Sequence, residues 1–327
     1  MPDETPYAPY AGPTLDAFAA QLKKETAAVR LQFSKFGVRR RLGLDQIARA
    51  AKIFSADSQL MSASKQILNS RDPAWVAVTS PIGKARLFWR TMTVPYPVKG
   101  IRLVRRELIP MFDQTLEAFA SELHQAKQKL ETAYVSLRLE AQQRLGQLFN
   151  HADYPESCTA DFTLEWDYPS VEPPDYLKEL NPALYEQERQ RLENRFAEAA
   201  ALAENAFAAE LQELVSHLVE RMTPEAADGT APGATAGKKK RLNKKAVDSF
   251  REFFERFQSI RVGSNAQLDQ LVSSARKLID GASLDDMRGN DLVRQNMAQE
   301  MTALRSQLDT MLIDRPKRAY NLDEDET

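Results

Sequence analysis

Residues 112–137 read FDQTLEAFASELHQAKQKLETAYVSL, and their apolar side chains recur at alternating intervals of four and three residues. A repeat of this kind is typical of a helix that packs along another helix, as in a coiled coil. This stretch therefore predicts a long helix with a helical partner. The seam positions are Phe112, Leu116, Phe119, Leu123, Ala126, Leu130, Ala133 and Leu137.

A second stretch, 184–222, carries a looser apolar seam. Two long helices in one chain, joined by a connecting segment at 150–181, predict an antiparallel coiled-coil-like hairpin over residues 101–222. The predicted fold class is mainly all-α, with additional short helices and at most a minor β element. The seam positions of the second helix are Leu192, Phe196, Ala199, Ala203, Phe207, Leu211, Leu214 and Leu218.

The N-terminal side of the hairpin shows two further segments. Residues 1–14 are proline-rich and are expected to be a flexible lead, and residues 15–100 are expected to be a helical region with an irregular or short β segment. Prolines and glycine between 75 and 96 predict loop there, with room for a short hairpin, because proline does not serve the interior of a sheet. Helices are expected at 15–33, 45–54 and 58–69.

On the C-terminal side, residues 223–243 combine proline, glycine and lysine without apolar periodicity, which predicts a disordered basic linker. Residues 244–315 are expected to be a helical region, and residues 316–327 an acidic tail. Within that region, helices are expected at 246–260, 265–279 and 291–313.

The connecting segment 150–181 is too aromatic for a simple linker. Its alternating Phe162, Leu164 and Trp166 predict one short strand. Its rings either pack within the chain or form a patch that docks a protein. The candidate docking residues are Tyr154, Trp166, Tyr168 and Tyr176.

Charge and hydropathy narrow the classes of function. The 44 basic and 46 acidic residues leave a net charge of −2, so the chain as a whole has no field that attracts nucleic acid or an anionic membrane. No apolar run approaches the roughly 20 residues of a membrane-spanning helix, and the N-terminus does not resemble a signal peptide. With a single cysteine, these features predict a cytoplasmic protein.

The sequence offers little for catalysis, so we expect a non-enzymatic protein. Phosphate-binding motifs such as GxxxxGK[ST] and GxGxxG do not occur, and one cysteine with three histidines makes a zinc site improbable; no cofactor or metal is expected. The best catalytic fragment is His151, Asp153 and Cys158, a thiol close to a base. It lacks a recognised nucleophile signature, and a structural role in the turn after Phe149 is the simpler interpretation.

Two basic clusters favour an alternative function in nucleic-acid binding. One precedes the expected helices at 45–54 and 58–69, which together could pass for a DNA-reading unit, and the other lies in the expected linker. Such runs also occur as solvated surface, where they bind nothing. The candidate nucleic-acid contacts are Arg39, Arg40, Arg41, Lys238, Lys239, Lys240, Arg241, Lys244 and Lys245.

Three separated motifs carry a resemblance to a known family. They are GQLFNHADYPESCTADFTLEWDYPSVEPPDYL at 146–177, VSHLVERM at 215–222 and AVDSFREFFERF at 246–257. In this order they resemble a bacterial and phage family, domain of unknown function 3150, over roughly residues 75–313. The resemblance implies a companion of MoxR-type AAA+ ATPases and assigns no catalytic residues. We therefore expect a helical interaction or scaffold protein, with a protein partner or self-association.

Overall fold

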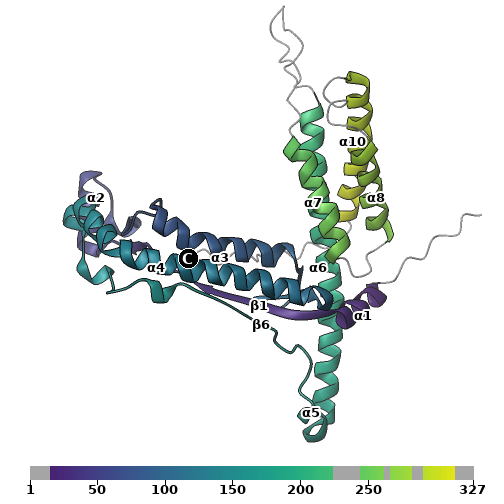
Figure 1. Ribbon diagram of the computed structural model, residues 1–327, viewed down its shortest axis with the longest axis horizontal. Helices are drawn as coiled ribbons and strands as arrows, with labels where there is room; N and C mark the ends of the chain where they lie inside the picture. Colours follow the sequence, from purple (N-terminus) through teal and green to yellow (C-terminus); the bar gives the residue numbers. More distant parts are fainter. Residues whose placement is uncertain (1–14, 224–243, 261–265, 282–289, 314–327) are drawn as a thin grey trace, which may run out of the picture. The chain divides into compact units, whose positions relative to one another are not determined.

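A computed structural model describes residues 15–223, 244–260, 266–281 and 290–313 (Figure 1). The described chain is mainly helical, as expected, and its strands are short and antiparallel. None of the described helices is both long and apolar enough to cross a membrane. Of the segments expected to be flexible or tail-like, 1–14 and 316–327 lie outside the described residues, as does all of 223–243 except Thr223.

The chain divides into two compact units, each of which is described by itself. Unit 2 comprises residues 29–91 and 107–169. Unit 1 draws its described residues from three parts of the chain, up to 28, from 92 to 106, and from 170 onward.

Unit 2 is built on two helices, α3 (Pro73–Thr91) and α4 (Ile109–Leu145), that pack together (Figure 1). The ring of Phe88 on α3 stacks on Phe112 of α4 with 5.2 Å between centroids and meets Phe119 edge-on at 6.1 Å. The seam expected in α4 is confirmed as its inner face, since six of its eight positions are buried and the other two half-buried. Helix α4 therefore has a helical partner, and that partner is α3.

The loop expected between residues 75 and 96 is wrong, because α3 spans most of it. Trp75, Val78, Ile82 and Ala85 are buried, and their intervals of three, four and three place them on one helical face. Pro81 lies inside the helix, where its ring removes one backbone donor, and is itself buried. Burial of this face against α4 outweighs the local preference of the proline.

An antiparallel ribbon of β1 (Thr26–Ser34) and β6 (Thr163–Asp167) belongs mostly to unit 2, with Leu31 opposite Trp166 and Phe33 opposite Leu164. The strand expected around Leu164 is confirmed. The helix expected at 15–33 is wrong beyond residue 25, where α1 (Leu15–Glu25) gives way to β1. In β1 the alternation of Val29, Arg30 and Leu31 separates buried apolar side chains from an arginine paired with Asp167.

Unit 1 is organised along α6 (Pro182–Met222), the second long helix that the sequence predicts. Its middle part packs with α1 and with a short hairpin of β4 (Val94–Pro95) and β5 (Ile101–Arg105). Phe196 meets Tyr96 edge-on at 5.5 Å between ring centroids. The helix expected from about 101 therefore starts later, after β5 and a 3-10 turn (Arg106–Leu108).

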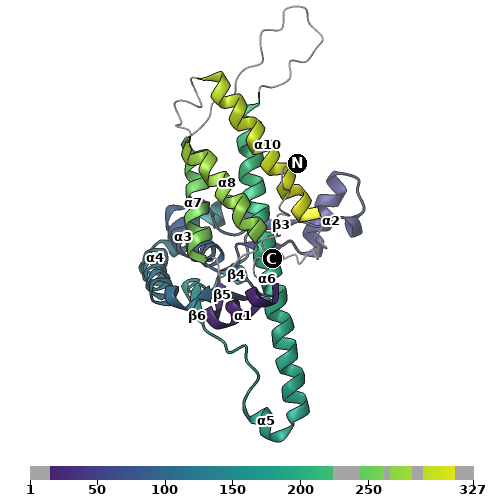
Figure 2. The ribbon, with the colours of Figure 1, turned by 90° about the vertical axis from the view of Figure 1, so that its right-hand side faces the viewer.

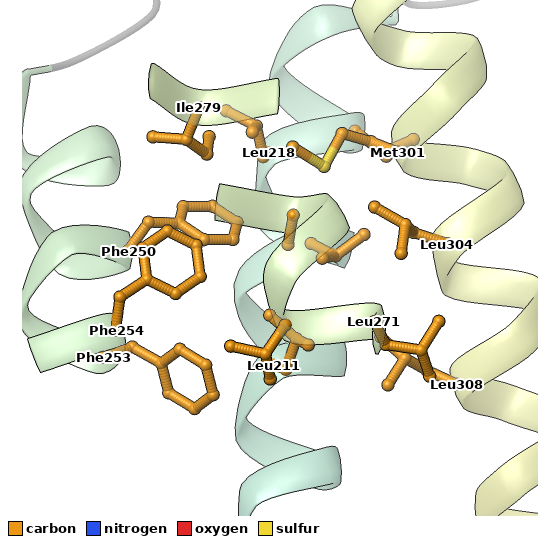
Figure 3. Close-up of a cluster of buried hydrophobic side chains, with 14 of the residues drawn as sticks. Leu211, Leu218, Phe250, Phe253, Phe254, Leu271, Ile279, Met301, Leu304 and Leu308 are labelled. Carbon is orange, nitrogen blue, oxygen red and sulfur yellow. The ribbon is translucent and has the colours of Figure 1, made fainter. Parts of the chain in front are cut away.

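The C-terminal part of α6 is covered by α7 (Lys244–Ile260), α8 (Ala266–Gly281) and α10 (Asp291–Ile313), as both ribbon views show (Figure 2). These three helices confirm the expectations for this region. Phenylalanines 250, 253, 254 and 257 of α7 are at most 3% exposed and meet leucines and methionines of the other helices (Figure 3). Labelled members of this core are Leu211, Leu218, Leu271, Met301, Leu304 and Leu308.

The hairpin expected for residues 101–222 is not confirmed. Helices α4 and α6 belong to different units, and other elements cover their seams: α3 packs on α4, while α1 and α10 pack on α6. A seam specifies that a helix needs an apolar neighbour, and any segment with a matching face can supply it. Helix α3, in a segment whose sequence predicts loop, supplies it for α4.

A buried arginine closes the end of α6. Arg294 of α10 is 8% exposed and donates from Nε to the carbonyl oxygen of Met222 at 3.0 Å and from a terminal guanidinium nitrogen to that of Arg221 at 2.5 Å. The last carbonyls of a helix have no partner within it and carry partial negative charge, so a guanidinium satisfies both needs.

We expect Arg294→Met to lower the free energy of unfolding of unit 1 by about 1–3 kcal/mol, because it leaves these carbonyls without the donor that caps them. Thermal unfolding followed by far-UV circular dichroism measures the effect. Arg305→Met is the matched control, since Arg305 lies on the same helix and is half-buried. Equal loss in both variants would show that the cap contributes nothing.

Candidate functional site

A short helix on a two-stranded base forms one part of unit 2. Strands β2 (Arg39–Arg41) and β3 (Ser64–Gln66) pair antiparallel, with Arg40 opposite Lys65, and α2 (Leu44–Ile53) and a 3-10 turn (Ser58–Leu60) lie between them in sequence. The helix expected at 58–69 is therefore wrong, whereas the one at 45–54 is confirmed. Gly43 N-caps α2, and its N–H donates to Gln46 Oε1 at 3.1 Å.

Helix α2 ends in a Schellman turn. The N–H of Ala56 donates to the carbonyl of Ala51 at 3.0 Å and that of Ser55 to Lys52 at 3.3 Å. Ser55 has a φ of 53°, a left-handed conformation that a residue with a Cβ adopts at a cost of about 1 kcal/mol. This defined turn fixes where Ile53 and Phe54 stand at the end of the helix.

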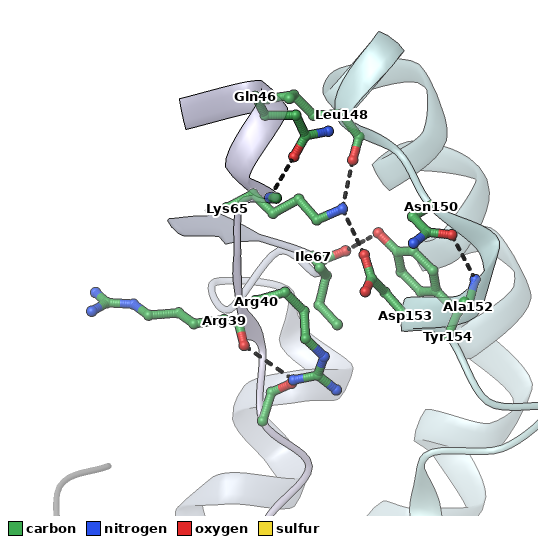
Figure 4. A network of polar contacts seen from close by, with 12 residues as sticks. Arg39, Arg40, Gln46, Lys65, Ile67, Leu148, Asn150, Ala152, Asp153 and Tyr154 are labelled. Carbon is green, nitrogen blue, oxygen red and sulfur yellow. Dashed lines mark hydrogen bonds and ion pairs between the residues drawn. The ribbon is translucent and has the colours of Figure 1, made fainter. Parts of the chain in front are cut away.

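A nearly buried ion pair anchors the base of this element to the turn after α4 (Figure 4). Lys65 Nζ lies 2.6 Å from Asp153 Oδ2 and donates to the carbonyl of Leu148, also at 2.6 Å. The two charged side chains are 7% and 15% exposed. Tyr154 OH donates to the carbonyl of Ile67 at 2.7 Å. The chain in and just after β3 is thus fixed at two points, Lys65 and Ile67.

This element exposes four large apolar side chains. Leu44 is 86% exposed, Ile53 78%, Phe54 73% and Leu60 88%, while Ile47 and Ala51 hold α2 to the unit. Four exposed basic residues occur in the same segment. We call the following set the α2 surface: Arg39, Arg41, Leu44, Arg49, Lys52, Ile53, Phe54 and Leu60.

The α2 surface is positively charged, whereas the chain as a whole has a small net negative charge. Residues 39–61 hold five basic and two acidic side chains, a net charge of +3, against −2 for the whole chain. In β2, Arg39 and Arg41 are exposed on one face, whereas Arg40 donates to the carbonyl of Gly37 at 2.7 Å and lies 5.3 Å from the ring of Phe36. The structure therefore presents two of the three candidate arginines and uses the third locally.

The other candidate basic residues lie elsewhere. Lys244 and Lys245 are exposed at the start of α7 in unit 1, and Lys238, Lys239, Lys240 and Arg241 lie outside the described residues. The basic clusters of the sequence analysis therefore belong to separate parts of the chain.

The four candidate docking rings also have separate environments. Tyr154 is buried, and Tyr176 is 61% exposed on α5 (Tyr176–Leu180) in unit 1. Trp166 and Tyr168 come together on one carboxylate, since Trp166 Nε1 and Tyr168 OH donate to Asp113 Oδ1 at 2.8 and 2.7 Å. Burial and this hydrogen bond raise the pKa of Tyr168 above its ordinary value. These two rings brace β6 against α4.

Cys158 is fully buried, and burial raises the pKa of its thiol to about 12. His151 is exposed, in edge contact with the ring of Phe149. In the part of the chain that the structure describes, no group of three or more His, Cys, Asp or Glu side chains could hold a metal ion.

An open cleft of about 500 Å³ lies in the same unit, between residues 66–71 and the last turns of α4. Arg144 on its wall pairs with Glu140 at 2.9 Å. Its lining is mostly polar, and no buried charged group points to a particular ligand.

The sequence interpretation missed the apolar half of the α2 surface, although a signal for it exists. Ile53 is two positions beyond buried Ala51, about 200° round the helix at 100° per residue, so it cannot share the inner face. An apolar residue out of phase in an amphipathic helix indicates either a second contact or exposure.

Comparison with protein-family models, curated proteins and solved structures found no match to this chain.

We expect Asp153→Asn to lower the free energy of unfolding of unit 2 by about 3 kcal/mol, because the Lys65 charge then stays buried without its partner. All three tryptophans, at 75, 89 and 166, lie in unit 2, so urea unfolding followed by tryptophan fluorescence reports on it. Glu122→Gln is the control, since its pair with Lys84 is half-exposed and should contribute about 0–1 kcal/mol. Similar losses in both variants would contradict the anchoring role.

A thiol-reactive probe should label Cys158 in the native protein at least about a thousandfold more slowly than in denaturant at pH 7. A rise in pKa from 9.0 to about 12 lowers the thiolate fraction by that factor, and burial adds to it. Stopped-flow or manual labelling kinetics measure both rates. If Cys158 in the native protein is labelled at the rate of an ordinary exposed cysteine, the hypothesis that it is a catalytic nucleophile would regain support.

Proposed function

We propose that this chain is a helical interaction or scaffold protein that binds another protein through the α2 surface. The observation that supports this is the exposure of Leu44, Ile53, Phe54 and Leu60, each at 73% or more, in one short segment. Apolar side chains gathered on a surface and rimmed by charge are typical of protein-binding sites. Isolated exposed leucines are ordinary, but four large ones within 17 residues are not.

The frame beneath the α2 surface is suited to binding. The Lys65–Asp153 pair and the Tyr154 hydrogen bond fix the base of the element, and the Schellman turn at Ser55 fixes the end of α2. A surface that is ordered before binding loses less conformational entropy when a partner arrives. The exposed arginines favour a partner with carboxylates, because a guanidinium pairs with them in a bidentate geometry.

The resemblance at 146–177 supplies a partner class to test first, a MoxR-type AAA+ ATPase. A chain without a nucleotide-binding motif that binds such an ATPase would act as its adaptor in the cytoplasm of a bacterium. The single cysteine, with no possible internal disulfide, supports that location.

Nucleic-acid binding through Arg39, Arg41 and the basic run up to Lys245 is the alternative function. The exposure of Arg39 and Arg41 favours it, since exposed guanidinium groups neutralise phosphates well. The apolar residues beside them favour protein, because large aliphatic side chains gain nothing from a phosphate backbone. A nuclease arm in the experiment separates the two functions.

We expect the double variant Phe54→Glu, Leu60→Glu to recover at least tenfold less of its partner from native cells than the wild-type chain, since it places charge in the apolar contact. Tagged chains are pulled down with and without nuclease, and partners are quantified by mass spectrometry. Leu87→Glu is the matched control, because Leu87 is 69% exposed on α3 of the same unit. Undiminished recovery by the double variant would contradict the proposal, and loss of every partner after nuclease would favour the alternative.

A further inference from the structure

A second surface with exposed apolar side chains lies in unit 1, where α5 packs on the N-terminal end of α6. Tyr176 is 61% exposed, Leu180 77% and Leu184 37%. Residues 182–191 of α6 contain no buried side chain, so this end of the helix contributes nothing to the core of unit 1. We call residues 172–184 the α5 tip.

The α5 tip is acidic. Its charged residues are Glu172, Asp175, Lys178 and Glu179, a net charge of −2. None of the three carboxylates pairs with another residue in the described chain, whereas Glu186 farther along α6 pairs with Arg189 at 2.5 Å. The tip therefore offers both apolar side chains and carboxylates to a partner.

The α5 tip and the α2 surface are complementary. The α5 tip has three exposed apolar side chains and a net negative charge. The α2 surface has four exposed apolar side chains and a net positive charge. We propose that the α2 surface binds the α5 tip of a second copy of the chain.

Such a contact is heterologous, because two different surfaces meet. A pair of copies leaves one α2 surface and one α5 tip unused. Association therefore continues head to tail until a ring closes or a filament forms. The contact is small, and we expect a Kd on the order of 10 µM for one pair. Salt should weaken it, because the Debye length falls from about 10 Å at 0.1 M to about 3 Å at 1 M.

This inference rests on the proposed role of the α2 surface in binding protein and names its partner. The tip of a second copy also gives the scaffold function a physical basis, since one kind of contact repeated along a series of copies builds an extended assembly. An ATPase partner would then meet an array of identical sites.

Sedimentation velocity of the purified full chain tests the inference with two variants. Phe54→Glu with Leu60→Glu disables the α2 surface, and Tyr176→Lys with Leu180→Lys disables the α5 tip. All four residues are at least 61% exposed, so the fold should survive, which circular dichroism checks. The controls are Leu87→Glu and Leu292→Lys, whose leucines are 69% and 70% exposed on α3 and α10.

The wild-type chain and both controls should grow in mean sedimentation coefficient over about a hundredfold range of concentration around the expected Kd. Each double variant alone should stay monomeric, but an equimolar mixture of the two should form dimers and nothing larger, because one intact α2 surface and one intact α5 tip remain.

Three outcomes would overturn the inference. They are a wild-type chain that is monomeric throughout, a double variant that still associates alone, and a mixture that does not dimerise. Binding of the monomeric wild-type chain to phosphatidylserine vesicles would assign the α2 surface to a lipid instead. A monomeric wild-type chain whose α2 variant still loses its partner in the pull-down would leave the proposed function standing without this inference.

Discussion

The need to cover two long apolar seams shapes this protein. Helices α4 and α6 run for 37 and 41 residues, and each carries apolar side chains along most of one face. At roughly 25 cal/mol for each Å² of apolar surface buried, a seam of six or more large side chains left in water would cost more than a domain's net stability. The chain meets this need twice, with α3 and the β1–β6 ribbon in unit 2 and with shorter helices along α6 in unit 1.

The two candidate surfaces lie on segments that do not bury the long apolar seams. Residues 182–191 of α6 extend beyond its buried part, and α2 uses only Ile47 and Ala51 for attachment. Both places keep apolar side chains that folding of the single chain does not require. Their opposite net charges distinguish them from scattered exposed leucines such as Leu87 and Leu292. We propose that assembly uses these apolar side chains, which folding of the single chain leaves exposed.

The sequence predicted the elements of this fold better than their pairing. The four-and-three spacing in α4 identified its buried face, because periodicity reports which side of a helix is apolar. Periodicity could not identify α3 as the partner, because Pro81 and the β-branched residues of that segment indicate loop or strand rather than helix. Strand β1 was also missed, as its first residues continue the apolar pattern of α1. For the candidate site, the arginines were visible in the sequence, but the exposure of Phe54 and Leu60 depends on the turns around them.

The most direct test of head-to-tail assembly is to identify which residues meet between copies. Equal amounts of ¹⁴N and ¹⁵N chains are mixed at high concentration and joined with a carbodiimide, which links amines to carboxylates in direct contact. Head-to-tail assembly should give mixed-isotope peptides that join Lys52 to Glu172, Asp175 or Glu179. Links between these residues found only within one isotope, or mixed links that join other surfaces and none of these, would contradict it.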